Sequence, residues 1–297
     1  MKSYLKALRI NRWPRSASIL IGTGAYWALT MNFSTDIVGF LPRIVVAFFL
    51  TWAISTANYV INEIVDAPFD AHHPDKKDRP LVHEEVRVEV LLLIFSLLVI
   101  STFAGAILVF KRAFFLSLLA LLLAGFVYNL RPVRLKDRAF IDSISESVNN
   151  PIRFLIGWYA LGSSFPDPFL LLSWWMLGNF LMVGKRYSEL LYLGKERARK
   201  YRRSFNFYTE KNLKVYLFLS AFLFLTSFLI FCWRQGLKFT AISSVFSLSF
   251  MFSFYKRAER ESVEEPESVL MKSSLLFSAS LFFFSLIVGI FLDNINL

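Results

Sequence analysis

Long apolar segments separated by polar connections run through the whole of this 297-residue chain. A helix needs about 20 apolar residues to cross the roughly 30 Å hydrocarbon layer of a bilayer. Runs such as LLLIFSLLVI are apolar on every side, whereas strands of a membrane barrel alternate between apolar and polar residues. The apolar stretches cover residues 16–32, 38–61, 88–110, 113–128, 140–162, 167–190, 213–233, 237–255 and 271–292. The pattern predicts an all-α integral membrane protein with nine transmembrane helices in a single domain, residues 1–297.

Composition supports this interpretation. Hydrophobic residues make up 56% of the chain, which contains 33 phenylalanines, more than a soluble domain needs to fill one core. The first apolar stretch follows basic residues and lacks a clean small-residue cleavage site, so we interpret it as a spanning helix rather than a signal peptide. The single cysteine, Cys232, cannot form an internal disulfide and gives no information about the redox compartment.

The distribution of basic residues predicts the orientation. Of the 33 Lys and Arg residues, 27 fall in the N-terminal segment and in every second connection, and five fall on the other side. Because basic residues accumulate on the cytoplasmic side of membrane proteins, we expect a cytoplasmic N-terminus and an external C-terminus in a prokaryotic inner membrane. Orientation and contact with anionic membrane lipids explain the net charge of +11 without a nucleic-acid partner.

A dense polar segment follows the second apolar stretch. Asn62, Asp66 and Asp70 are spaced four residues apart, so a continuous helix would turn them by only about 40° per step and keep them on one side. Pro68 disfavours helical geometry at the residue before it, which predicts that Asp70 lies on a new turn or a descending loop. Oxygen ligands at the end of a helix suit Mg²⁺, which binds through one or two carboxylates and phosphate oxygens.

The fifth apolar stretch contains a second group of polar residues. Asp142, Glu146, Asn149, Asn150 and Arg153 recur at helical spacing and form one polar stripe on an otherwise apolar helix. Charged side chains within a membrane span usually face a cavity and mark function. For the two asparagines, hydrogen bonding between helices is the alternative explanation.

The first of these segments resembles a known family. The string N-E-x-x-D-x-x-x-D, followed by K-K-D-R-P-L, is similar to the first aspartate-rich motif of the UbiA superfamily of intramembrane prenyltransferases. Tyr128, Lys136 and Asp142 match the Tyr…Leu-Lys…Asp stretch of that family. The resemblance implies nine helices, a cytoplasmic active face, and a Mg²⁺-dependent transferase that uses a polyprenyl lipid and a donor containing a diphosphate.

The segment G-K-R-Y-S-E-L at residues 184–190 predicts the donor. Family members that use a prenyl diphosphate have a second D-x-x-x-D motif in this region, whereas here one carboxylate, Glu189, accompanies Lys185 and Arg186. This string resembles the polyprenyl-phosphate phosphoribosyltransferase branch. The expected reaction joins polyprenyl phosphate to 5-phosphoribosyl diphosphate and releases diphosphate, with Glu189 either pairing with Lys185 or accepting a ribose hydroxyl.

The expected site contains two groups of residues. The magnesium ligands and catalytic residues are Asn62, Asp66 and Asp70. The substrate-binding residues are Lys77, Arg79, Tyr128, Lys136, Asp142, Arg153, Lys185, Arg186 and Glu189.

Two other functions remain open at this point. The first is prenyl transfer from a polyprenyl diphosphate to an aromatic acceptor such as 4-hydroxybenzoate, and the second is lipid transport or binding without catalysis. The basic segment at residues 195–203 is expected at anionic headgroups, with contact to substrate as the alternative.

Overall fold

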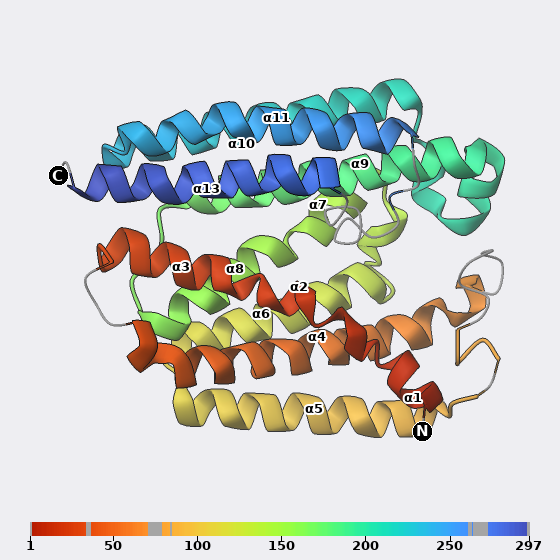
Figure 1. The fold of residues 1–297 in the computed structure, drawn as a ribbon. Helices are drawn as coiled ribbons and strands as arrows, with labels where there is room; N and C mark the ends of the chain where they lie inside the picture. The colour runs from red at the N-terminus through yellow and green to blue at the C-terminus, as the bar shows by residue number, and fades with distance from the viewer. Residues whose placement is uncertain are drawn as a thin grey trace.

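The computed structural model describes residues 2–33, 37–70, 79–83, 85–260, 263 and 273–295. Within these ranges the regular elements are helices, which confirms the predicted all-α class (Figure 1). The α-helices are α1 Lys2–Ala7, α2 Pro14–Ala17, α3 Ile19–Thr30, α4 Leu41–Asp70, α5 Val88–Val109, α6 Arg112–Asn129, α7 Ile141–Ser147, α8 Asn149–Leu161, α9 Pro168–Tyr201, α10 Glu210–Gln235, α11 Lys238–Arg260 and α13 Ser273–Ile295. The short 3₁₀ helices are η1 Ile10–Arg12, η2 Ile37–Phe40, η3 Leu135–Asp137 and η4 Arg203–Asn206.

Local sequence signals fix several helix ends. Thr209 and Asn212 form a reciprocal capping box at the start of α10, which satisfies two amide donors there. Asp167 caps α9, and a proline occupies the first position of that helix. Gly236 ends α10 in the left-handed conformation, so α11 can return antiparallel beside it.

Within the described residues the bundle has two large hydrophobic cores and a smaller cluster around Ala7, Val60, Val86 and Leu91. One large core is built by α3, α4, α5, α6 and α8, and the other by α9, α10, α11 and α13. Helix α9 packs against α10 and α11 and also contacts α7 and α8, so it joins the two groups. In Figure 1 the N-terminus and the C-terminus lie at opposite ends of the helices.

Helices α3 and α8 approach each other through glycines. A Cβ atom on Gly157 would lie 1.9 Å from the carbonyl oxygen of Ile19, and a Cβ on Gly22 would lie 1.9 Å from that of Phe154. Thr23 donates a hydrogen bond of 3.1 Å to the carbonyl of Gly157. Small residues and hydroxyl groups at such crossings let membrane helices approach closely. This contact fixes α8, and with it Arg153, beside the N-terminal segment.

The predicted count of nine transmembrane helices is not confirmed. In the described part of the chain, five helices are long and apolar enough to cross a membrane, at Ile37–Pro68, Val88–Val109, Arg112–Asn129, Glu210–Gln235 and Ser274–Ile295. The first predicted stretch forms the 12-residue helix α3 after a short helical segment. The fifth divides into α7 and α8, of 7 and 13 residues. Polar side chains interrupt the apolar pattern in this part of the bundle, because the helices here enclose a polar cavity.

Candidate active site

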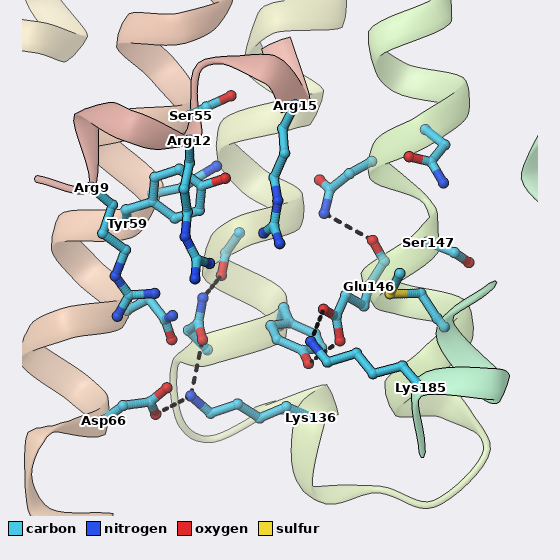
Figure 2. A pocket seen from close by; sticks show the side chains of 18 of the residues that line it. Arg9, Arg12, Arg15, Ser55, Tyr59, Asp66, Lys136, Glu146, Ser147 and Lys185 are labelled. Carbon is cyan, nitrogen blue, oxygen red and sulfur yellow. Dashed lines mark hydrogen bonds and ion pairs between the residues drawn. The ribbon is translucent and has the colours of Figure 1, made fainter. Parts of the chain in front are cut away.

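A polar cavity of about 230 Å³ lies among the N-terminal segment, α4, α6, η3, α7, α8 and α9 (Figure 2). Its basic lining residues are Arg9, Arg12, Arg15, Arg79, Lys136, Arg153, Lys185 and Arg202, and its acidic ones are Asp66, Glu146 and Glu189. Eight cations therefore face three carboxylates. A cavity with this excess of positive charge attracts a ligand with several negative charges.

Helix α4 carries the first predicted motif, and Asn62 and Asp66 both line the cavity. The prediction that Asp70 lies on a new turn or loop is wrong, because α4 continues through Pro68 to Asp70. The proline removes one amide donor, and the helix ends within a turn of it, so the disruption is confined to the last turn. Asp70 borders an adjoining cavity of about 210 Å³, and Asp66 lines both cavities.

Asp66 is paired with two basic residues of the connection between α6 and α7. The ammonium group of Lys136 contacts its Oδ1 atom, and a guanidinium nitrogen of Arg134 lies 3.4 Å from the same oxygen. Lys136 also donates a hydrogen bond of 3.0 Å to the side chain of Asn129 (Figure 2). Burial lowers the pKa of Lys136 to about 8, and the neighbouring Asp66 carboxylate limits this fall.

Two of the three acidic residues of α4, Asp66 and Asp70, are candidate ligands of a magnesium ion. Both basic contacts of Asp66 are to Oδ1, which leaves Oδ2 for a further ligand. Asp70 is buried and pairs with Arg79. No group of three or more His, Cys, Asp or Glu side chains suited to a metal lies within the described ranges. Asp66 and Asp70 are oxygen donors of the kind that Mg²⁺ takes together with water and phosphate oxygens.

Helix α9 carries the second predicted motif. The three charged residues of this motif do not all face the cavity. Lys185 and Glu189, four residues apart, both line the cavity, whereas Arg186 is turned by about 100° from Lys185 and is fully buried. The ammonium group of Lys185 lies 3.9 Å from Glu146 of α7. The prediction that Arg186 lines the phosphate site is therefore corrected, since its side chain does not belong to the cavity wall.

Arg186 is instead the centre of an ion-pair network beneath the cavity. It donates a hydrogen bond of 3.0 Å to Asp142, another of 3.0 Å to Glu189, and a short one to Glu146. A planar guanidinium has several donors in fixed directions, which suits it to join carboxylates from two helices. Arg186 therefore sets the positions of Glu146 and Glu189 in the cavity wall.

Asp142 also lies outside the cavity wall, although it was predicted to bind substrate. Its carboxylate is fully buried and accepts hydrogen bonds from Arg186, from Ser204 at 3.2 Å and from the phenol of Tyr208. Burial, together with the charge of Asp142, raises the pKa of Tyr208, so this phenol stays protonated as a donor. Through the hydrogen bonds from Ser204 and Tyr208, Asp142 connects α7 to the segment before α10.

The other predicted residues have varied positions. Tyr128 lines the cavity and donates a hydrogen bond of 2.9 Å to Glu146. Arg153 lines it too, with a guanidinium nitrogen 3.5 Å from the hydroxyl of Ser55. Arg79 lines the cavity as well. Lys77 lies outside the described residues.

Sequence reasoning missed several cavity residues. Arg9, Arg12 and Arg15 were counted for orientation alone, although all three line the cavity. Arg202 falls in the basic segment expected at headgroups, yet it lines the cavity and lies 3.1 Å from the phenol of Tyr128. Gly194, with φ 71°, bends α9 before this segment. A kink at a glycine could have been anticipated, but its direction could not.

Comparison with known proteins gives the class of this bundle. The chain belongs to the UbiA prenyltransferase family, whose model matches residues 18–285. It is similar to the decaprenyl-phosphate phosphoribosyltransferase of Mycobacterium tuberculosis (strain CDC 1551 / Oshkosh), with 27% identity over 219 residues, 73% of this chain and 69% of that protein. The enzyme of the same name from Mycolicibacterium smegmatis is 28% identical over 223 residues, 73% of this chain and 66% of the relative.

Solved structures share the fold. A UbiA homologue from Archaeoglobus fulgidus bound to DMAPP and Mg²⁺ superposes with a TM-score of 0.70 at 18% identity, over 97% of this chain and 99% of the other. A structure described in connection with digeranylgeranylglyceryl phosphate synthase superposes with a TM-score of 0.63 at 16% identity, over 100% and 99%. The family and the five described helices that are long and apolar enough to cross a membrane together make this an integral membrane protein.

Proposed function

We propose that this protein transfers the phosphoribosyl group of 5-phosphoribosyl diphosphate to a polyprenyl phosphate and releases diphosphate. The observation that carries the proposal is the charge of the cavity, where eight basic residues line the wall with three acidic ones. The named relatives of the chain, at 27 and 28% identity, point to the same substrates.

The number of phosphate groups distinguishes this reaction from prenyl transfer. The sugar donor has a 5-phosphate in addition to its diphosphate, and the lipid acceptor brings another phosphate monoester. Each phosphomonoester carries a charge of about −1.5 to −2 near pH 7. A prenyl diphosphate with a neutral aromatic acceptor brings neither of these groups. Lys185, placed where a second acidic motif would need a carboxylate, adds a cation for the extra phosphate charge.

The residues of α4 and η3 would act on the leaving group. Asn62, Asp66 and Asp70 would hold Mg²⁺, which when bound stabilises the negative charge that develops on the departing diphosphate. Lys136 and Arg79 lie beside these residues and would contact the remaining phosphate oxygens. The bond between C1 of the ribose and the diphosphate oxygen breaks, and an oxygen of the lipid phosphate forms the new bond to C1.

The acceptor needs little activation. A lipid phosphate is already largely ionised near neutral pH, so its oxygen can attack without a strong general base. The protein then contributes mainly by positioning the two phosphate-bearing substrates and by stabilising charge. Tyr128 and Glu146, which form a hydrogen-bonded pair on the wall, would together contact the ribose hydroxyl groups.

Prenyl transfer to an aromatic acceptor is the second candidate function. The A. fulgidus homologue with the same fold was solved with the prenyl diphosphates DMAPP and GPP and with Mg²⁺, which favours a prenyl donor. That reaction uses the same α4 residues and requires fewer cations elsewhere in the cavity.

A product assay tests the proposal. Purified protein in lipid nanodiscs would be incubated with Mg²⁺, labelled 5-phosphoribosyl diphosphate and a polyprenyl phosphate. We expect a labelled lipid whose mass equals polyprenyl phosphate plus a phosphoribosyl group, dependent on the metal. A parallel incubation with a labelled prenyl diphosphate and 4-hydroxybenzoate should give no product. Product in the second incubation alone would refute the proposal in favour of prenyl transfer.

We also infer that the cavity opens to the cytoplasm. After Cys232→Ser, single cysteines introduced by Lys195→Cys and Ser163→Cys report on the two ends of α9. An impermeant maleimide added to intact cells should label the cysteine at position 163 and leave that at position 195 unlabelled until the membrane is broken. Labelling of both in intact cells would contradict this orientation.

A further inference from the structure

The N-terminal segment supplies three arginines to the cavity and precedes the region that the family model matches, which starts at residue 18. Arg9, Arg12 and Arg15 lie in and around η1 and α2, at three-residue spacing. All three line the cavity, so this short segment presents three arginine side chains to it.

The figure shows where these groups point. Arg12 and Arg15 extend from the N-terminal segment into the cavity, from the side opposite Asp66 and Lys136 (Figure 2). The cavity thus has two basic walls separated by its empty volume. The wall formed by α4 and η3 includes the carboxylate of Asp66, whereas the N-terminal wall is formed by arginines.

Buried contacts hold the N-terminal wall in place. Arg9 pairs with Glu63 of α4 at 2.7 Å, and both side chains are buried. The backbone of Arg9 is left-handed, with φ 50°, a conformation that costs free energy for a residue with a Cβ atom. The guanidinium carbons of Arg9 and Arg12 lie 5.9 and 5.8 Å from the ring centre of Tyr59.

Tyr59 provides a second, independent indication of a ligand. Its hydroxyl oxygen is buried and has no hydrogen-bond partner within the described part of the chain, although the residue lines the cavity. Buried hydroxyl groups almost always find a partner, because leaving one unsatisfied is costly. An oxygen of a ligand held by Arg12 and Arg15 would accept this hydrogen bond.

We propose that Arg12, Arg15 and Tyr59 form the subsite for the phosphate of the polyprenyl acceptor, an inference that rests on the proposed function. A phosphate monoester matches two guanidinium groups and a phenolic donor. The same chemistry could bind the 5-phosphate of the sugar donor, and the position of the segment favours the lipid.

The surroundings of the segment are those of a membrane interface. Leu5 and Trp13 on either side of Arg9 and Arg12 are 48% and 51% exposed. Trp13 packs edge-on against Phe48 of α4, a helix that is long and apolar enough to span the membrane. Exposed tryptophans are typical of the headgroup level. A phosphate on a membrane-embedded polyprenyl chain lies at this level.

The test measures binding of each substrate separately. The double variant Arg12→Gln/Arg15→Gln would be compared with wild type in nanodiscs, using native mass spectrometry to titrate a short polyprenyl phosphate. We expect lipid affinity about 10- to 100-fold lower, because charge-assisted hydrogen bonds are lost. Affinity for 5-phosphoribosyl diphosphate should stay within about twofold. Arg12→Lys/Arg15→Lys should recover part of the loss, and Lys2→Gln, which removes an exposed charge from the same segment, should leave both affinities unchanged.

The outcomes separate this inference from the proposed reaction. Unchanged lipid affinity in the double variant would refute the subsite, even if wild type makes the phosphoribosyl lipid. Loss of affinity for the sugar donor instead of the lipid would also refute it and would assign the arginines to the 5-phosphate. Wild type that binds the lipid through these arginines but forms no product would refute the reaction and retain the subsite. A Tyr59→Phe variant, which removes the unsatisfied hydroxyl alone, should weaken lipid binding by a smaller factor, and no change would remove Tyr59 from the subsite.

Discussion

Helices α4 and α9 each bring a polar motif to the same cavity, and the two motifs behave differently. On α4, Asn62, Asp66 and Asp70 are four residues apart and stay near the cavity or its neighbour. On α9, Lys185 and Glu189 share the cavity side, while Arg186 is buried below it. The α4 motif consists of side chains with oxygen donors, whereas the α9 motif contains a cation, a carboxylate and a buried arginine that positions the carboxylate.

The difference predicts a separate role for each motif. Oxygen ligands alone suit a metal ion on a diphosphate, and basic residues suit a phosphate that has no metal. If α9 also held a metal ion, the ammonium group of Lys185 would repel that ion, and Glu189 would be the one carboxylate of the motif on the cavity side. The comparison therefore leads to four tests, each of which alters one motif and leaves the other intact.

The largest effect is expected from Asp66→Asn on α4. Loss of a ligand that supports charge stabilisation on the leaving group costs several kcal/mol, so turnover should fall by at least about 10³-fold. Turnover is measured in nanodiscs at saturating Mg²⁺. The folded fraction of the variant should stay close to that of wild type. Glu210→Gln, which removes an exposed acidic charge at the start of α10, is the control and should retain full activity. Normal turnover of Asp66→Asn would exclude α4 from the metal site.

Arg186→Gln should have the next largest effect, on stability. Removing one partner of a buried ion pair costs about 3 to 5 kcal/mol, and here three carboxylates would lose their cation. Unfolding in a denaturing detergent would measure the loss. Arg186→Lys should restore part of it, since an ammonium group keeps the charge but lacks the fork of donors. A raised KM for the sugar donor with unchanged stability would instead make Arg186 a phosphate ligand, as the sequence suggested.

Lys185→Ala should have a smaller effect that is confined to binding of the sugar donor. A lost charge-assisted contact costs about 1.5 to 3 kcal/mol, which corresponds to a roughly 10- to 100-fold higher KM for 5-phosphoribosyl diphosphate. Lys195→Ala, beyond the kink in α9, is the matched control. Equal kinetics in the two variants would contradict a phosphate role for Lys185.

Glu189→Gln should have the smallest effect and distinguishes two roles. Its carboxylate accepts a hydrogen bond of 3.0 Å from Arg186, and an amide oxygen can retain that bond without the charge. If Glu189 accepts a hydrogen bond from a ribose hydroxyl, the KM for the sugar donor should rise by about 10-fold or less. If it only supports Arg186, the temperature of unfolding should fall with KM unchanged.

The sequence predicts the helical class and the α4 motif well, because both depend on local periodicity. Hydropathy identifies apolar segments, and four-residue spacing places Asn62 and Asp66 on one side without knowledge of other helices. The number of spanning helices was not confirmed, since α7 and α8 form a divided, partly polar pair around the cavity. Hydropathy cannot distinguish such a pair from one continuous span.

The remaining site residues depend on contacts between distant segments. Nothing local distinguishes Arg186 from Lys185, and their different positions follow from the carboxylates that α7 presents to α9. The N-terminal arginines enter the cavity because Glu63 anchors Arg9 across 54 residues of sequence. Both results depend on tertiary packing, which periodicity within one segment does not encode.

The central claim is that the cavity selects a donor rich in phosphate, and a competition assay tests it most directly. Wild-type protein in nanodiscs would receive Mg²⁺, polyprenyl phosphate, 4-hydroxybenzoate, and equal concentrations of labelled 5-phosphoribosyl diphosphate and labelled prenyl diphosphate. The ratio of the two products gives the ratio of kcat/KM values for the donors. We expect the phosphoribosyl lipid to exceed the prenylated aromatic product by at least about 100-fold, the factor expected from two additional charge-assisted contacts. A ratio in favour of the prenylated product would contradict the account.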